Sequence, residues 1–178
     1  MVKSIGIKKI KTAVFISGKG TNLRNLIKFS KLKKSPIKIC LVFSSNRLAK
    51  GLDYAKKYLI KMKIYNFTNK KKAEFLILKD LKINRIDLIC LAGFMKILSP
   101  DFIKKFKGKI LNIHPSLLPK YKGLNTHARA IKNKDKYSGC TVHLVNAKLD
   151  SGKIILQKKI RIFKSCLLYT SPSPRDRS

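Results

Sequence analysis

The sequence predicts an α/β fold in a single domain, with a mostly parallel sheet covered by helices on both faces. Short apolar runs alternate along the chain with segments of helical periodicity. Runs such as ICLVF and LICLA are apolar without interruption, which is typical of parallel strands buried on both faces. The 178 residues, 44% of them hydrophobic, are enough for one packed core and exclude a disordered polycation.

Seven strands are expected, each an apolar run bounded by polar, glycine or proline residues. The fourth is the most convincing buried strand and the third is the weakest. The predicted strands cover Thr12–Ser17, Ile37–Phe43, Lys63–Phe67, Ile86–Ala92, Lys109–His114, Cys140–Val145 and Lys153–Ile162.

Five helices are expected between these strands. Residues Ser44–Asn46 are capping candidates for the second helix, and Ser99 with Pro100 supplies a cap and an N1 proline for the fourth. The predicted helices cover Asn22–Lys33, Arg47–Tyr58, Lys70–Lys82, Ser99–Phe106 and Thr126–Lys132.

The last residues differ in composition from everything before them. Residues 165–178, SCLLYTSPSPRDRS, contain no lysine and are broken by two prolines. We expect this segment to be a non-native tail, such as translated vector sequence, and exclude it from the fold. The expected domain is therefore residues 1–164, truncated at its C-terminal end.

The chain is strongly basic, with 42 Lys+Arg residues against 8 Asp+Glu and a formal net charge of +34. Of the basic residues 35 are lysines spread along the chain, whereas proteins that read bases rely on the planar fork of arginine. We expect a solvated lysine surface that attracts small anionic substrates, without a specific nucleic-acid partner.

Membrane, secreted and zinc-binding proteins are disfavoured by the same sequence. No run approaches the ~18 apolar residues of a membrane-spanning helix, and the apolar block after residues 1–11 is too short for a signal peptide. The four cysteines have no CxxC spacing. We therefore expect reduced thiols in a cytoplasmic protein, with neither disulfides nor a zinc site.

The first candidate site follows the first predicted strand. Backbone N–H groups at the glycine-bearing start of a helix can approach an anion, and the helix N-terminus adds a partial positive charge. Side chains here add donors suited to a phosphate. The spacing fits neither a Walker loop nor the dinucleotide fingerprint, and a plain strand–helix turn is the alternative. The residues concerned are Gly18, Lys19, Gly20, Thr21 and Asn22.

The second candidate site lies at the end of the strand Lys109–His114, where open α/β sheets place ligands. Alternation along a strand places Asn112 and His114 on one face. A carboxamide beside an imidazole suits stabilisation of an oxyanion and transfer of a proton during acyl transfer. The alternative is a histidine satisfied by local backbone.

Asp150 is one of few acidic residues in the chain and precedes Ser-Gly, which is usual in turns. Beside His114 it would raise the pKa of that histidine and fix its tautomer. We expect His143 to be structural or supporting, because it alternates with apolar neighbours, whereas His127 could line a site. No two histidines have metal-ligand spacing, so we predict no catalytic metal.

In this order, the motifs resemble the phosphoribosylglycinamide formyltransferases, folate-dependent enzymes of purine synthesis within the formyl-folate transferase family, which have a Rossmann-like fold. The matching stretches are VFISGKGTNLRNLI at 14–27, DLICLAGFMKILSP at 87–100, KILNIHPSLLPKYKGLNTHARAI at 109–131 and GCTVHLVNAKLDSGKIILQKKI at 139–160. The resemblance implies transfer of the formyl group of 10-formyltetrahydrofolate to the amine of 5′-phosphoribosylglycinamide on the route to IMP.

The resemblance also implies roles for individual residues. Residues Gly18–Asn22 would hold the phosphate of the ribonucleotide. Asn112 and His114 would bracket the formyl carbon, with Asp150 raising the pKa of His114. The amine would attack the formyl group directly, without a covalent enzyme intermediate. The family also has an acidic contact to the glycinamide and a closing helix beyond Ile160, which we expect to be missing here.

The expected folate pocket involves a second group of residues. The pteridine ring would lie against the segment after the fourth predicted strand, whose backbone groups would read the ring edge, and Asn112 would also contact the formyl folate. A lysine would replace the arginine with which the family contacts folate; Lys72 fits best, and Lys70 and Lys71 are the other choices. The segment residues are Met95, Lys96, Ile97 and Leu98.

Two functions are alternatives to formyl transfer to the ribonucleotide. Another formyl-folate enzyme, either methionyl-tRNA formyltransferase or formyltetrahydrofolate deformylase, shares the Asn-x-His and Asp core, although it would carry a further domain. A non-catalytic module that binds polyanions through a decayed enzyme fold would show broad binding to DNA or RNA that weakens steeply with salt.

Overall fold

A computed structural model describes residues 8–162 of the chain, so the expectation for residues 165–178 lies outside the described residues. Seven strands form one sheet in the order β3-β2-β1-β4-β5-β6-β7. The strands are β1 (Ile10–Ile16), β2 (Ile37–Ser44), β3 (Lys61–Ile64), β4 (Leu88–Leu91), β5 (Lys109–His114), β6 (Tyr137–Leu144) and β7 (Ile154–Arg161). The helices are α1 (Thr21–Ser30), α2 (Gly51–Lys57), α3 (Lys70–Ile83), α4 (Pro100–Lys105) and α5 (Thr126–Lys132).

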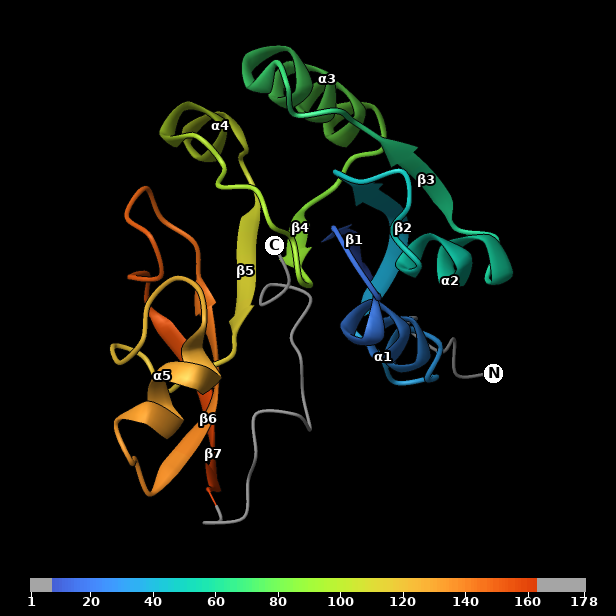
Figure 1. Ribbon diagram of the computed structural model, residues 1–178. Coiled ribbons are helices and arrows are strands. Elements are labelled where there is room, and N and C mark those ends of the chain that lie inside the picture. Colours follow the sequence, from blue (N-terminus) through green and yellow to red (C-terminus); the bar gives the residue numbers. More distant parts are fainter. Residues whose placement is uncertain (1–7, 163–178) are drawn as a thin grey trace.

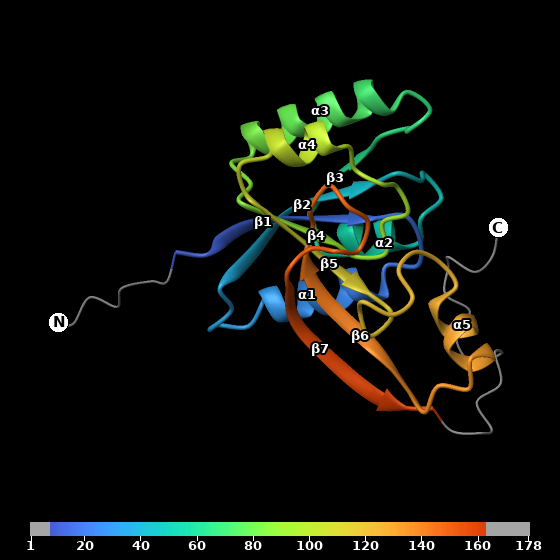
Figure 2. The same ribbon diagram turned by 90° about the vertical axis from the view of Figure 1, so that its left-hand side faces the viewer.

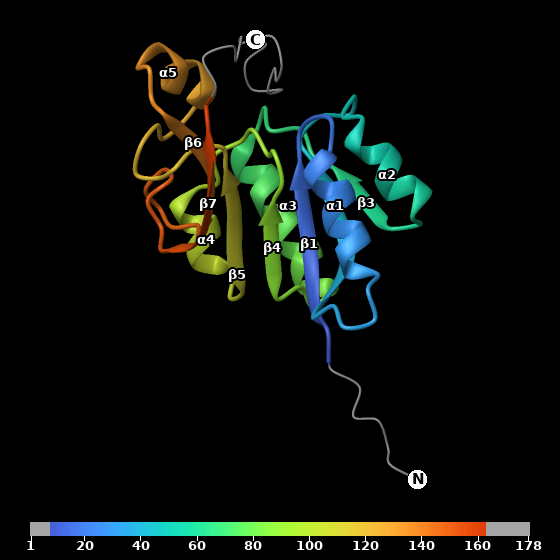
Figure 3. The same cartoon turned by 90° about the horizontal axis from the view of Figure 1, so that it is seen from below.

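The mostly parallel sheet with helices on both faces is confirmed. Helices α3 and α4 lie on one side of the sheet and α1 on the other, as Figures 1 and 3 show. Strands β1 to β5 pair in parallel, so their carboxyl ends meet at one edge. The chain runs outward from β1 through β2 to β3, then returns to β4 on the other side of β1. The boundary between β1 and β4 is therefore the topological switch point, where sheets of this kind place ligands.

The last two strands run antiparallel to their neighbours, in contrast to the five before them. Strand β6 pairs antiparallel with β5 and β7 antiparallel with β6. Figure 2 shows that β6 and β7 continue as a long ribbon with α5 near its far end. The hydrophobic pattern of these strands does not distinguish the two directions, because direction depends on how the intervening chain returns.

The predicted second helix begins later than expected. Its first residue is Gly51, not Arg47, and its N-cap Lys50 makes no side-chain capping bond. The expected cap Asn46 instead accepts a hydrogen bond from the Leu48 N–H at 2.9 Å, which forms a local turn. Two other elements, β5 and α5, have the predicted bounds.

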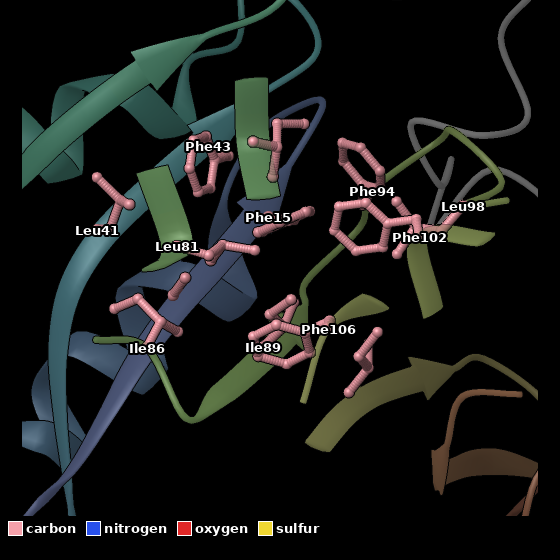
Figure 4. Close-up of a cluster of buried hydrophobic side chains, with 13 residues drawn as sticks. Phe15, Leu41, Phe43, Leu81, Ile86, Ile89, Phe94, Leu98, Phe102 and Phe106 are labelled. Atoms are coloured by element: carbon pink, nitrogen blue, oxygen red, sulfur yellow. The ribbon is translucent and has the colours of Figure 1, made fainter. Parts of the chain in front are cut away.

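The core consists of two apolar layers on opposite faces of the sheet. Val14 and Ile16 pack with α1 and α2, whereas Phe15 and Phe43 pack with α3 and α4. Figure 4 shows Phe15 among Phe43, Phe94 and Phe102. The Phe15 ring meets those of Phe43 and Phe94 edge to face, with centroids 5.0 and 5.3 Å apart. Burial of Phe94 anchors the start of the segment between β4 and α4.

No helix in residues 8–162 is long and apolar enough to cross a membrane.

Candidate active site

The loop between β1 and α1 packs closely against the start of α2. Gly20 has φ 73°, in the left-handed region, and caps α1 without a side-chain hydrogen bond. A Cβ on Gly20 would lie 2.4 Å from the Gly51 Cα, so only glycine fits this close approach. The first turn of α1 holds no acidic residue, and its N–H groups can therefore donate to a ligand. The five predicted residues Gly18–Asn22 thus form the turn from β1 into α1, and we call this turn the anion cradle after the role predicted for it.

A second group of polar side chains lies at the end of β5. Asn112 is directly opposite His143 of β6 in the antiparallel register. The Asn112 Nδ2 atom lies 3.2 Å from His143 Nε2 and 3.4 Å from Asp150 Oδ1. Asn112 and Asp150 are thus brought together as expected, and His143, which we expected to be structural or supporting, completes the group.

His114 is fully buried behind this group. Its Nε2 atom lies 2.8 Å from the Tyr121 carbonyl oxygen, and its Nδ1 atom lies 3.3 Å from Asp150 Oδ2. The Tyr121 carbonyl can only accept, so Nε2 carries a proton, and the Nδ1 atom faces the Asp150 carboxylate at ion-pair distance. The predicted pairing of His114 with Asp150 is therefore present in the structure.

Asp150 is the shared acceptor of the cluster. Its Oδ2 also accepts the Gly123 N–H at 2.9 Å, and its Oδ1 is 3.6 Å from His143 Nε2. Burial by itself would raise the pKa of Asp150, but hydrogen bonds from His143 and Gly123 and the positive charge of the histidines hold it below its ordinary value of 3.8. Asp150 is therefore an anion across the neutral pH range.

The pKa of His143 shifts in the opposite direction. Burial disfavours its charged form, but hydrogen bonding to Asp150 and to the Leu144 carbonyl, with the negative charge of Asp150, raises the pKa of His143 above 6.5. An imidazole with a raised pKa beside a carboxylate can supply a proton near neutral pH.

A cavity of about 210 Å³ opens beside these groups. The polar part of the lining consists of Lys96, Asn112, His143, Asn146, Lys148 and Asp150, whereas His114 does not line the cavity. The apolar part of the lining comes from Leu91, Phe94, Met95, Ile97, Leu98, Ile103, Leu124, Val145, Ala147 and Leu149. Pockets for whole drug-sized ligands measure roughly 300–1,000 Å³, so this cavity fits a ring system whose substituents leave through the mouth.

The four residues Met95–Leu98 all line this cavity, as predicted. The three candidate lysines do not. Lys70 and Lys71 line a larger groove of about 1,270 Å³ between α3 and α4, and the exposed Lys72 lines neither cavity. We place the site in the smaller cavity, because the larger groove contains no histidine and no amide side chain.

The anion cradle and the cavity share one edge of the sheet. The cradle follows β1, Met95 follows β4 and Asn112 lies near the end of β5, and these three strands are adjacent. Strands lie ~4.8 Å apart, so the ends of β1 and β5 are roughly 10 Å apart. One ligand with an anionic end can therefore span both regions.

Among residues 8–162, no three His, Cys, Asp or Glu side chains are grouped to hold a metal ion. In the same range Cys40, Cys90 and Cys140 are free thiols. Burial raises the pKa of Cys90 to about 11, so this thiol is protonated and unreactive at neutral pH.

Relatives of the chain are known. Phosphoribosylglycinamide formyltransferase of Haemophilus influenzae is 49% identical over 156 residues, covering 86% of this chain and 74% of that protein. The Escherichia coli protein of the same name is 40% identical, covering 84% of this chain and 72% of its own length. The human trifunctional purine biosynthetic protein adenosine-3 is 43% identical over 158 residues, but the chain spans only 16% of its length.

Solved structures lead to the same family. The phosphoribosylglycinamide formyltransferase of Brucella melitensis superposes with a TM-score of 0.85 at 40% identity, covering 90% of this chain and 84% of that one. The enzyme of Anaplasma phagocytophilum gives a TM-score of 0.84 at 39% identity, with coverages of 90% and 76%. A family profile described as formyl transferase matches residues 10–168, and the chain therefore belongs to the formyl transferase family.

Proposed function

We propose that this chain transfers the formyl group of 10-formyltetrahydrofolate to the amine of 5′-phosphoribosylglycinamide, a step of purine synthesis. One observation carries the proposal. The carboxamide of Asn112 and the carboxylate of Asp150 line an apolar cavity that shares a sheet edge with an anion cradle. This arrangement suits an acyl transfer between an apolar donor and a phosphorylated amine, and the relatives described above carry the name of that reaction.

The cradle binds the phosphorylated substrate. Backbone N–H groups of Gly18–Asn22, with the Lys19 ammonium and the Thr21 hydroxyl, donate to its phosphate. The substrate then extends across the end of β4, so that its amine reaches the end of β5. Binding through the remote phosphate thus positions the nucleophile.

The cavity binds the folate. Met95, Lys96, Ile97 and Leu98 border the pteridine ring, and their backbone groups read its polar edge, with Asn112 beside the formyl group. Support for this step comes from the apolar lining of the cavity. Lys72 is exposed, so in this proposal it contacts only the outer, carboxylated part of the folate.

The reaction is a direct acyl transfer. The amine attacks the formyl carbon and forms a new C–N bond, and the carbonyl oxygen becomes an oxyanion held by Asn112 and His114. Collapse of the tetrahedral intermediate breaks the bond to the folate nitrogen, which takes up a proton while the former amine loses one. Asp150 keeps the neighbouring imidazoles protonated and oriented. For His114 to donate, its Nε2–H exchanges the Tyr121 carbonyl for the substrate oxygen.

The test is a transfer assay on wild type and His114→Ala, with His127→Ala as the matched control. His127 lies on α5 and does not line the cavity. Loss of one oriented oxyanion donor lowers kcat about 10²–10³-fold, so we expect His114→Ala to fall by that factor while His127→Ala stays near wild type. Near-normal turnover by His114→Ala would remove this residue from the mechanism.

The choice of acceptor separates the alternatives. We expect formyl transfer to 5′-phosphoribosylglycinamide, none to charged tRNA, and no release of free formate. Transfer to tRNA would favour a methionyl-tRNA formyltransferase, and formate release would favour a deformylase. Salt-sensitive binding to DNA or RNA without any transfer would favour the polyanion-binding module. Small-molecule partners and a cytoplasmic location belong to the same proposal.

A further inference from the structure

We propose that Ser17 is a positioning residue that couples the anion cradle to the folate cavity. The inference rests on the proposed function and deepens it, because it adds an energetic link between the two substrate subsites. Ser17 does not line the cavity, so it affects folate binding only through the residues with which it forms hydrogen bonds.

Ser17 connects three loops at the carboxyl edge of the sheet. Its N–H donates to the Gly93 carbonyl at 3.1 Å, and its Oγ accepts the Met95 N–H at 2.9 Å. The same Oγ lies 2.7 Å from the Ser45 Oγ, on the loop after β2. Two of these contacts, to Gly93 and Met95, hold the segment that enters the cavity lining, and the one to Met95 spans 78 positions in sequence.

The Ser17 contacts lie between the two expected substrate subsites. Ser17 directly precedes the cradle residues Gly18–Asn22, and Met95 is the first of the four residues that border the expected pteridine site. The contacts cross between the ends of β1 and β4, which is the switch point of the sheet. An anion that orders the cradle therefore also orders Ser17, and through it the Met95 backbone.

Coupling of this kind is measurable and reciprocal. The ligand that binds first orders the shared loops, so the second ligand loses less conformational freedom on binding. By thermodynamic linkage, the ribonucleotide must change the affinity for folate by the same factor by which folate changes the affinity for the ribonucleotide. Typical coupling factors lie between about 5 and 150.

Two variants isolate the Met95 contact. Ser17→Ala removes the hydroxyl from both Met95 and Ser45, whereas Ser45→Ala removes only the hydroxyl–hydroxyl bond. The two variants therefore differ in the hydrogen bond from the Met95 N–H, which only Ser17→Ala removes. Ser17→Cys, which keeps a side chain of similar shape with a weak acceptor, serves as a second variant should Ser17→Ala fail to fold.

The experiment measures the dissociation constant of 5′-phosphoribosylglycinamide with and without saturating tetrahydrofolate, and then the reciprocal pair. We expect a coupling factor of at least about 5 in wild type and in Ser45→Ala, and a factor near 1 in Ser17→Ala. Amide hydrogen exchange at Met95 gives a second readout, which we expect to accelerate in Ser17→Ala and to stay unchanged in Ser45→Ala.

The outcomes are distinguishable. Equal coupling factors in Ser17→Ala and Ser45→Ala, or a wild-type factor of 1 with both ligands bound, overturn the role of Ser17 and leave the proposed function standing. Failure of wild type to bind either ligand overturns the proposed function and this inference together.

Discussion

Asp150 is the residue on which the polar groups of the cavity converge, and its partners constrain one another. The His143 Nδ1 atom lies 2.9 Å from the Leu144 carbonyl, so Nδ1 carries a proton. In neutral His143 the Nε2 lone pair then accepts from the Asn112 amide at 3.2 Å. When Nε2 is protonated it can no longer accept that hydrogen bond, and its N–H instead faces Asp150 Oδ1. The charge of His143 and the orientation of Asn112 are therefore linked.

Asp150→Asn tests this linkage. Removal of the carboxylate takes away the hydrogen bond and the negative charge that raise the pKa of His143, while burial continues to lower it. We expect the pKa of His143 to fall in Asp150→Asn. A titration of the histidine ring protons by NMR measures it, with His127 on α5 as an internal reference. An unchanged His143 titration would contradict the pairing.

The same variant has a defined effect on stability. The pKa of Asp150 is lowered in the folded state, so its contribution to the free energy of unfolding is present above about pH 4 and is lost as pH falls through the lowered value. The pKa of His143 is raised, so its contribution is present below about pH 6.5 and is lost as pH rises through the raised value. Urea unfolding of wild type and Asp150→Asn should therefore differ most between these limits.

At the scale of elements, two glycines with the same backbone conformation differ in what surrounds them. Gly20 has φ 73° and Gly93 has φ 77°, but a Cβ on Gly93 would meet nothing within 4 Å, whereas one on Gly20 would overlap Gly51. The pair therefore separates backbone strain from the packing of the cradle against α2.

We expect Gly93→Ala to lower the free energy of unfolding by about 1 kcal/mol, the cost of a left-handed alanine. Gly20→Ala should cost about 1–3 kcal/mol more, because the overlap forces the start of α1 away from α2. Chemical denaturation measures both. Equal losses would show that the contact between Gly20 and Gly51 has no energetic weight.

Helices α3 and α4 are joined by a buried carboxylate. Glu74 accepts the Ser99 N–H at 2.8 Å and the Ser99 hydroxyl at 2.5 Å, while the Ser99 Oγ caps α4 by accepting the Phe102 N–H. Ser99 ends the segment that begins at Met95. Glu74 thus anchors the far end of the cavity lining.

Glu74→Ala should lower the free energy of unfolding by about 1–3 kcal/mol, because the half-buried Ser99 N–H and hydroxyl lose their charged acceptor. It should also raise KM for the formyl donor, since the segment is released at Ser99. Asp101→Ala is the matched control: Asp101 also lies at the start of α4, but its bond to Lys105 is solvent-exposed and worth less than about 1 kcal/mol. Equal effects of the two variants would contradict the anchoring role of Glu74.

Short sequence motifs predict where helices and strands lie better than they predict which side chains meet in the site. Ser99 and Pro100 mark the start of α4 because capping is local chemistry. The predicted start of α2 was wrong, because the true start depends on tertiary contacts. One of these is the hydrogen bond that the Gly51 N–H donates to the Gly18 carbonyl. The place of His143 beside Asn112 depends on antiparallel register across 31 residues, which alternation within one strand cannot reveal. The pairing of Asp150 with His114 was expected mainly through family resemblance.

For the molecule as a whole, the dominant electrostatic feature is charge of one sign. The chain carries a formal charge of +34, and residues 8–162 contain only three pairs between a lysine and a carboxylate, at Asp80, Asp101 and Asp135. Most lysines in this range therefore have no carboxylate within ion-pair distance. Such a surface repels itself and attracts anions, and both effects are screened by salt.

Added salt should therefore move stability and substrate binding in opposite directions. Between about 20 and 300 mM NaCl the Debye length falls from roughly 20 to 6 Å, so screening relieves repulsion between lysines and Tm should rise. Over the same range KM for the phosphorylated substrate should increase, because the field that draws it to the cradle is weakened. Sucrose at matched osmolality is the control: it can raise Tm by exclusion from the surface but leaves the electrostatic field intact, so KM should not follow. A fall in Tm with NaCl, or a KM insensitive to it, would show that the lysine surface is too well solvated for its net charge to govern either property.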